Sequence, residues 1–252
     1  MNMMLRVGHI DLSFHDASAI EVERILQRHG HVIERSAAPH EEMFRRLGRG
    51  EVDVLVSAWL PSSHGGYLAP MENEVTKITV LYEPFCIWGV PDYVPEETVS
   101  AVGDLMKEPA VSRMQKRIQG INPGAGISRF SQATLEQYRM ADAGYSFHSG
   151  TEAECFDGFE KAYAAGRWLV IPLWHPQYLH NRYRIRALEE PLGLLGTTDA
   201  ATLVIRNEAM KRVQAGALVE LGRLYLGNQQ VSALDDALHR RGMQRTALAP
   251  EA

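Results

Sequence analysis

The sequence predicts an α/β protein built from two lobes. Apolar, strand-like runs alternate with amphipathic helical runs over residues 5–82, a pattern typical of a largely parallel sheet covered by helices. Residues 84–95 then contain three prolines, Pro84, Pro91 and Pro95. Because proline cannot donate to the hydrogen-bond ladder, a strand in the middle of a sheet is not expected to continue through this segment. We therefore expect this segment to cross to a second lobe, and the apolar run 202–205 to return as a strand of the first.

The first lobe is expected to begin with a strand at 5–10 and a helix from Asp16 to about His29. Asp16 is a suitable N-cap residue, and Gly30 is a suitable C-terminal stop. The other elements expected in this lobe are a helix at 41–47 and strands at 31–33, 52–56 and 78–82.

The second lobe is expected to be richer in helix. We interpret 86–91 as a connector and expect helices at 104–117 and 152–165, a turn at 122–127 and a buried strand at 168–173. Two helices should end the chain. The predicted lobes are residues 1–86 with 191–252, and residues 87–190.

Composition narrows the function classes. The chain has 252 residues, 45% hydrophobic and 23% charged, and a formal net charge of −5, so it lacks the basic footprint of a nucleic-acid binder. No apolar run approaches the ~20 residues of a membrane span. The only cysteines, Cys86 and Cys155, have no zinc-site spacing, and one disulfide between them is left open. No metalloprotease, nucleotide-loop or nucleophile-elbow motif occurs, so we expect no enzyme, metal or cofactor.

The N-terminus is too short and too polar for a secretory signal. Three explanations stay open: a cytoplasmic protein, a signal already removed, or a start that differs from the biological one.

Two tryptophans are the strongest candidates for ligand contact. Trp59 and Trp174 each follow an apolar strand and precede a proline-containing turn, and open α/β sheets build their ligand sites at strand ends. A quaternary ammonium group has no N–H, so the negative faces of aromatic rings can hold it without unpaired polar groups. Core filling is the alternative interpretation for each ring.

Four further residues have a functional and a structural interpretation. Trp88 either plugs the crossing or faces the ligand, and Phe14 follows the first strand at its end. His64 either lines the site or caps a turn. Asp16 either caps its helix or places a carboxylate near a cation or hydroxyl.

Backbone groups are candidates as well. Ser149 and Glu152 form a capping-box pattern, and the N–H groups that begin such a helix can cradle a carboxylate. The turn at 122–127, which includes Ala125, can bring its backbone to a ligand.

Six motifs occur in an order that is familiar from one family. They are Ser13–Asp16, Gly50–Val54 leading to Trp59-Leu60-Pro61, Trp88–Val94, Pro123–Ile127, Ser149–Ala153, and Trp174–Tyr178 followed by Leu188–Pro191. In this ordered set the chain resembles the substrate-binding proteins of glycine betaine/choline ABC importers.

The resemblance implies a two-lobed, type II periplasmic-binding-protein-like (Venus flytrap) fold with a mixed, mostly parallel sheet in each lobe. It implies an extracytoplasmic, monomeric protein without enzymatic activity that holds choline or glycine betaine in an aromatic cage between the lobes and delivers it to an ABC permease. A cytoplasmic sensing or regulatory module that reuses this fold is the alternative. The ligand-binding residues expected are Phe14, Asp16, Trp59, His64, Trp88, Ala125, Ser149, Gly150, Thr151, Trp174 and Tyr178.

Overall fold

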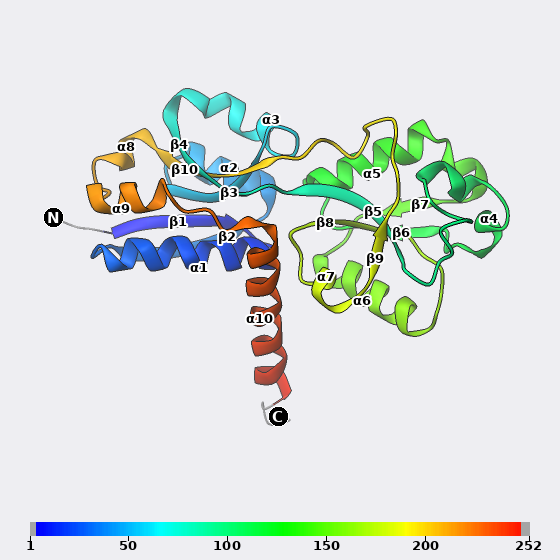
Figure 1. The fold of residues 1–252 in the computed structure, drawn as a ribbon. Coiled ribbons are helices and arrows are strands. Elements are labelled where there is room, and N and C mark those ends of the chain that lie inside the picture. The colour runs from blue at the N-terminus through cyan, green and yellow to red at the C-terminus, as the bar shows by residue number, and fades with distance from the viewer. Residues whose placement is uncertain (1–3, 248–252) are drawn as a thin grey trace. The chain divides into compact units, whose positions relative to one another are not determined.

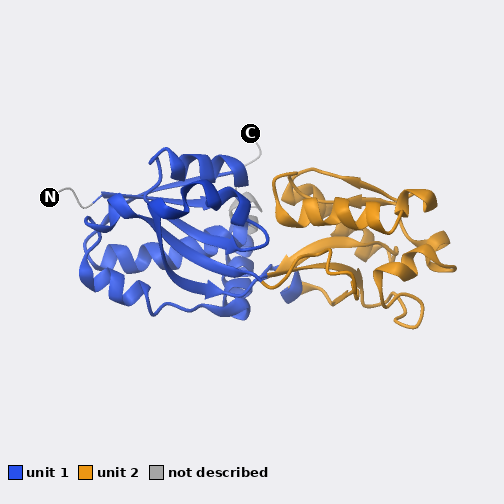
Figure 2. Ribbon diagram, turned by 90° about the horizontal axis from the view of Figure 1, so that it is seen from above, with its two compact units in different colours: residues 1–84, 176–181, 199–252 blue, residues 85–175, 182–198 orange. Residues whose placement is uncertain are grey.

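The chain divides into two compact units. The computed structural model describes the backbone of residues 4–247 and the side chains of residues 4–242. Unit 1 comprises residues 1–84, 176–181 and 199–252, and unit 2 comprises residues 85–175 and 182–198 (Figure 2). The predicted boundaries at 86/87 and 190/191 did not anticipate the return of residues 176–181 to unit 1.

Unit 1 is built on a mixed five-stranded sheet (Figure 1). Its order is β2 (Val32–Ala38), β1 (Met4–Ile10), β3 (Val54–Leu60), β10 (Ala200–Arg206) and β4 (Val75–Tyr82). Strand β1 is parallel to β2 and β3 because helices α1 (Ser13–Arg28) and α2 (His40–Gly48) make the crossovers. Strand β10 enters from unit 2 and runs antiparallel to β3 and β4.

Helix α1 begins earlier than its sequence pattern suggested. Leu12 is the N-cap, and the Asp16 N–H already donates to the Leu12 carbonyl at 3.1 Å, so the prediction of Asp16 as N-cap is wrong. The predicted stop is confirmed, because Gly30 has a left-handed φ of 83°, which glycine adopts without a Cβ penalty.

Two strands of unit 1 extend further than predicted. Strand β2 pairs with β1 along its whole length, from Met4↔Val32 to Ile10↔Ala38, although much of its outer side is polar. Trp59 lies inside β3 rather than in a following turn. The rest of unit 1 consists of α3 (Gly65–Leu68), a 3₁₀ helix (Ala69–Glu74), α8 (Asn207–Met210), α9 (Ala215–Leu221) and α10 (Gly227–Ala247).

Unit 2 holds a three-stranded antiparallel sheet in the order β8 (Ile171–His175), β5 (Phe85–Pro91), β9 (Ile185–Ala187). The prediction that 86–91 is a connector is therefore wrong. Pro84 precedes the strand and Pro91 ends it, so every residue between them keeps an N–H for the ladder. A mostly parallel sheet was expected in this unit, but its parallel pairing is confined to β6 (Arg117–Gln119) and β7 (Ser146–His148).

The stretch 104–117 is helix-rich, as predicted, but it forms no single helix. Pro109 lies within it, and the chain instead forms a 3₁₀ helix (Val102–Met106) and a one-turn α4 (Ala110–Arg113) before entering β6. The remaining helices are α5 (Gly126–Gln137), a 3₁₀ turn (Met140–Ala143), α6 (Glu152–Ala164) and α7 (Leu179–Arg182).

Helix α6 forms as predicted, but its cap lies two residues further along the chain. Thr151 Oγ1 accepts the Glu154 N–H at 3.1 Å, and the Glu154 carboxylate accepts the Thr151 N–H at 2.7 Å. The capping box is therefore Thr151 with Glu154 rather than Ser149 with Glu152.

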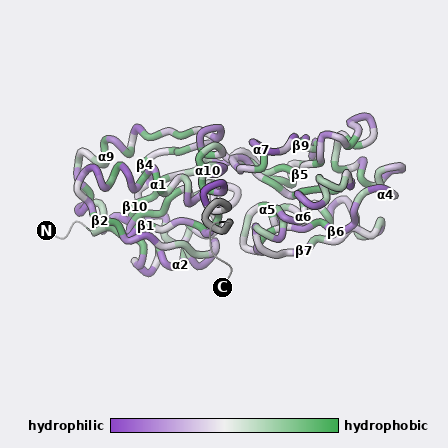
Figure 3. The backbone as a smooth tube through the Cα atoms, turned by 90° about the horizontal axis from the view of Figure 1, so that it is seen from below, coloured by the Kyte–Doolittle hydropathy of each residue, from purple (hydrophilic) through white to green (hydrophobic). Residues whose placement is uncertain are grey.

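Apolar residues follow the central strands of each unit (Figure 3). Trp168 belongs to the core of unit 2, as predicted, with the Arg113 guanidinium 3.9 Å from its ring centroid. Cys86 and Cys155 are not joined in a disulfide. None of the helices within residues 4–247 combines the length and apolar character that a bilayer crossing needs.

Candidate ligand site

In unit 1, Phe14 and Trp59 form an aromatic pair. Phe14 lies in the first turn of α1 and Trp59 near the end of β3, with ring centroids 5.3 Å apart. The orientation of the Trp59 ring is fixed by a hydrogen bond, because its Nε1–H donates to the Tyr82 hydroxyl at 3.1 Å. Burial raises the pKa of Tyr82 to about 12, so this hydroxyl stays neutral and remains a stable anchor.

Histidines surround this aromatic pair. His64 accepts the Trp59 backbone N–H on Nδ1 at 2.8 Å, which fixes the neutral tautomer with its proton on Nε2. Its ring centroid lies 5.3 Å from that of His40 and 6.3 Å from that of His15. His64 therefore shapes the backbone at Trp59. His15 and His40 were missed because no sequence spacing links them to each other or to Trp59.

His15 is kept neutral by its surroundings. It is 1% exposed, and burial, followed by the nearby His64, His40 and His9, holds its pKa well below the ordinary value of 6.5. A neutral imidazole beside Phe14 and Trp59 adds polarisable surface without repelling a cation.

Acidification should therefore destabilise the protein through His15. As the pH falls below about 6.5, His15 takes up a proton in the unfolded chain but not in the folded protein. The free energy of unfolding therefore decreases as the pH decreases. We expect this residue to contribute a loss of about 1.4 kcal/mol between pH 7.5 and 5.5. Urea unfolding of wild type and His15→Gln at both pH values measures it. An identical pH dependence in the two proteins would contradict the assignment.

Asp16 is not a free carboxylate. It pairs with Arg35, which also binds both Glu23 oxygens at 2.6 Å, and Asp16 Oδ1 lies 3.6 Å from His9 Nε2. Asp16 therefore shares a single guanidinium with Glu23, and its negative charge is only partly compensated within unit 1.

In unit 2, Trp88 and Trp174 lie on one face of the antiparallel sheet. Cys86 is opposite Trp174 and Trp88 is opposite Pro172, so the two indoles occupy diagonal positions on that face. Trp88 is fully buried, and its Nε1–H donates to the Ser131 hydroxyl at 2.8 Å. Trp174 is 1% exposed, with its ring 5.7 Å from that of Phe156.

Removing the Ser131 hydroxyl should be costly. Ser131→Ala leaves the buried Trp88 N–H without its acceptor, and we expect a loss of about 1–3 kcal/mol in the free energy of unfolding. Denaturant titration measures it. In a Trp88→Phe background, which has no indole N–H, the same serine change should cost little. An equal cost in both backgrounds would show that the hydrogen bond is not responsible.

The backbone candidates of unit 2 already have partners. The N–H of Gly150 donates to the Ile121 carbonyl at 3.2 Å, and that of Ala125, the N-cap of α5, to the Asn122 carbonyl at 3.2 Å. The Thr151 N–H is held by Glu154, and Ser149 is exposed. A Cβ at Gly150 would approach Glu154 Oε2 to 2.5 Å, so a larger residue there would have to displace the Glu154 side chain that caps α6.

Tyr178, the last predicted site residue, belongs to the segment 176–181 of unit 1 and is 5% exposed. Its N–H donates to Asp235 at 2.9 Å, and its ring centroid lies 3.8 Å from that of His239. The structure thus groups Phe14, Trp59 and His64 within unit 1, and Trp88 and Trp174 within unit 2.

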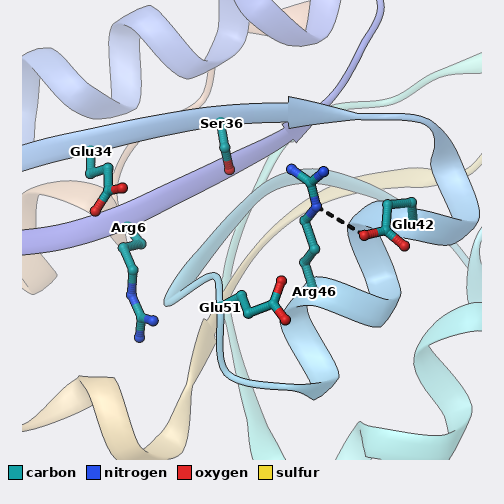
Figure 4. Close-up of a pocket in the computed structure, with 6 residues that line it drawn as sticks. All are labelled: Arg6, Glu34, Ser36, Glu42, Arg46 and Glu51. Atoms are coloured by element: carbon teal, nitrogen blue, oxygen red, sulfur yellow. Dashed lines mark hydrogen bonds and ion pairs between the residues drawn. The ribbon is translucent and has the colours of Figure 1, made fainter.

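A polar pocket of about 250 Å³ in unit 1 is a poor match to an ammonium cage. Its lining carries charges of both signs and no aromatic ring (Figure 4). Arg46 is bound to Glu42 at 3.1 Å and Arg6 to Asp53 at 2.7 Å, so its cations already have partners. The lining residues are Arg6, Glu34, Ser36, Glu42, Arg46 and Glu51. Within the described residues, no group of three or more His, Cys, Asp or Glu side chains is arranged to hold a metal ion.

Comparison with known proteins gives one family. The model of the substrate-binding domain of ABC-type glycine betaine transport systems matches residues 4–251. A glycine betaine/carnitine transport binding protein of Listeria monocytogenes is 24% identical over 89 residues, 35% of this chain and 30% of that protein. The match thus spans less than a third of that relative's length.

Solved structures share the fold. Lactococcal OpuAC, closed around glycine betaine, superposes with a TM-score of 0.81 at 21% identity, over 94% of this chain and 90% of that one. The ProX glycine betaine/L-proline-binding protein of Borrelia burgdorferi gives 0.82 at 20% identity, over 94% and 88%. A choline-binding protein with bound choline gives 0.78 at 15% identity, over 96% and 84%. The fold is therefore that of the two-lobed substrate-binding proteins.

Proposed function

This chain belongs to the family of substrate-binding domains of ABC-type glycine betaine transport systems, and from that premise we propose that it binds a small quaternary ammonium compound, choline or glycine betaine. The family binds substrates and does not transform them. The observation that carries the proposal is the Phe14–Trp59 pair, with ring centroids 5.3 Å apart and the indole fixed by Tyr82.

The trimethylammonium head is the part of the ligand that this arrangement suits. Aromatic faces attract a cation that cannot donate hydrogen bonds, and a desolvated contact is worth about 2 kcal/mol per ring. Trp88 and Trp174 of unit 2 are the proposed partners of Phe14 and Trp59, and they share one sheet face. A neutral His15 adds no opposing charge.

Choline and glycine betaine differ only at the end away from the trimethylammonium head, which is a hydroxyl in choline and a carboxylate in glycine betaine. Asp16 shares Arg35 with Glu23, so its attraction for a cation and its repulsion of a carboxylate are both reduced. The N–H groups of Gly150 and Thr151 already donate to protein oxygens. We therefore propose that the shared trimethylammonium head supplies most of the affinity and that both compounds bind.

Calorimetric titration with three compounds tests this function. Choline and glycine betaine should bind, whereas 3,3-dimethylbutan-1-ol, which has the shape of choline without its charge, should bind more weakly by tens-fold or more, as expected when about 2 kcal/mol per ring depends on the cation. Equal affinity for the neutral compound, or no heat with either ammonium compound, would contradict the proposal.

We further propose that the loaded protein delivers its ligand to the permease of an ABC importer outside the cytoplasm. Family membership supports this role. Reconstituted transport with and without the protein is the corresponding assay.

A further inference from the structure

Helix α10 contacts two of the three segments at which the chain passes between the units, residues 81–83 and 176–181, which we call the first and second connectors. The chain leaves unit 1 after Pro84, returns for residues 176–181, and returns finally at Asp199. Asn228, Ser232, Asp235 and His239 follow one another at intervals of four, three and four residues, so they lie on one face of α10. We refer to these four side chains as the α10 clamp.

The first connector is held at the start of α10. The Asn228 amide binds the Glu83 backbone twice, accepting its N–H at 3.1 Å and donating to its carbonyl at 2.7 Å. Just before the helix, the Leu226 N–H donates to the Leu81 carbonyl at 2.7 Å. The residues directly before Pro84 are thus fixed to α10 through their backbone.

The second connector is held one turn later. The Gln177 N–H donates to Ser232 Oγ at 3.1 Å, and the Tyr178 N–H donates to Asp235 Oδ2 at 2.9 Å. Gln177 and Asp235 are fully buried, and Ser232 is 5% exposed, so water cannot replace these acceptors. The Tyr178 ring packs against His239 in a tilted arrangement, with 3.8 Å between centroids.

The segments held by the clamp lie next to candidate ligand residues or to their hydrogen-bond partners. Trp174 lies two residues before the clamped segment 176–181, and Tyr82, which anchors Trp59, lies directly before Glu83. Asp235 lies close enough to Tyr82 for its negative charge to add to the effect of burial in raising the pKa of that phenol. One helix face therefore fixes the chain next to Trp174 and next to Tyr82, the hydrogen-bond partner of Trp59.

We propose that the α10 clamp is a positioning element: it holds both connectors on unit 1 and thereby limits the conformations that the two units sample without ligand. Asn228, Ser232 and Asp235 act through the connectors and touch no ligand themselves. The effect on affinity rests on the proposed function, whereas the effect on the ligand-free protein does not.

Distance measurements between spin labels test the clamp without ligand. Labels are placed at Val32→Cys in unit 1 and Leu192→Cys in unit 2, which are 63% and 56% exposed, with Cys86→Ser to remove the accessible native thiol; Cys155 is 2% exposed. We expect Ser232→Ala and Asp235→Ala to broaden the distance distribution by about twofold, because each leaves a buried connector N–H without its acceptor. Ser232→Thr, which keeps a hydroxyl, should restore the wild-type width.

Asp236→Asn is the matched control. Asp236 lies on the same helix and is 6% exposed, but it binds Arg240 one turn along α10, so the wild-type width should persist. Wild-type widths in folded Ser232→Ala and Asp235→Ala would overturn the proposal. If Asp235→Ala does not fold, Asn228→Ala replaces it, because its amide holds the first connector from a partly exposed position.

Calorimetry separates this proposal from the proposed function. A wild-type protein that binds no quaternary ammonium compound refutes the function but leaves the distance test of the clamp intact. If it binds, we expect Ser232→Ala to raise Kd about fivefold, because a broader ligand-free ensemble contains less of the binding-competent conformation. A broadened distribution with unchanged Kd would overturn the link between the clamp and binding.

Discussion

Lowering the electron density of the Trp59 ring should weaken ligand binding stepwise. Mono-, di- and trifluorotryptophan at this position keep the shape of the indole but progressively reduce the negative charge on its face. The full cation–π contribution of about 2 kcal/mol per ring corresponds to about 30-fold in affinity, and trifluorination should remove most of it. Calorimetric titration of choline against each protein measures the trend.

Fluorination is preferable to alanine at this site. Trp59 is 6% exposed, and its Nε1–H is bound to Tyr82, so Trp59→Ala would also destabilise the protein by about 3–5 kcal/mol. Trp168, buried beside Arg113 in unit 2, is the matched control, and its fluorination should not change affinity. If the affinity for choline stays constant across the fluorinated Trp59 proteins, that ring lies outside the ligand site.

Loss of the Asp53 carboxylate should strongly destabilise the protein. Asp53 accepts the Arg6 backbone N–H at 3.0 Å and pairs with the Arg6 and Arg212 guanidinium groups at 2.7 and 2.6 Å. Its side chain is 3% exposed. Asp53→Ala leaves these donors without their buried acceptor, and we expect a loss of about 3 kcal/mol, measured by urea unfolding at pH 7.

The pKa of Asp53 also predicts a loss of stability in acid. Burial opposes the charged form of Asp53, but the hydrogen bonds from Arg6 and Arg212 outweigh burial and lower its pKa below 3.8. Its stabilisation is therefore complete above about pH 5 and is lost as pH falls through the lower folded value. Glu51→Ala, which removes an exposed partner of Arg49, should leave the unfolding midpoint nearly unchanged. An equal shift for both variants would contradict the burial argument.

Local patterns predicted much of unit 1 but less of unit 2. The alternation of apolar runs in unit 1 indicated the order of its strands and helices, because each β-α-β crossover there uses elements adjacent in sequence. In unit 2, β5 was mistaken for a connector because its prolines were counted without their positions at the two strand ends. Pairing with β8, more than 80 residues away, decides that strand.

The sequence by itself determined the α/β class and the family, and it predicted the aromatic residues that we propose for a quaternary ammonium ligand. These follow from periodicity and short motifs, which are local properties of the chain. Only the tertiary structure decided that Asp16 pairs with Arg35, that His15 is held neutral near His40 and His64, and that α10 holds both connectors. Charge compensation, pKa and hydrogen-bond partners depend on groups distant in sequence that folding brings within a few ångströms, and no spacing rule encodes them.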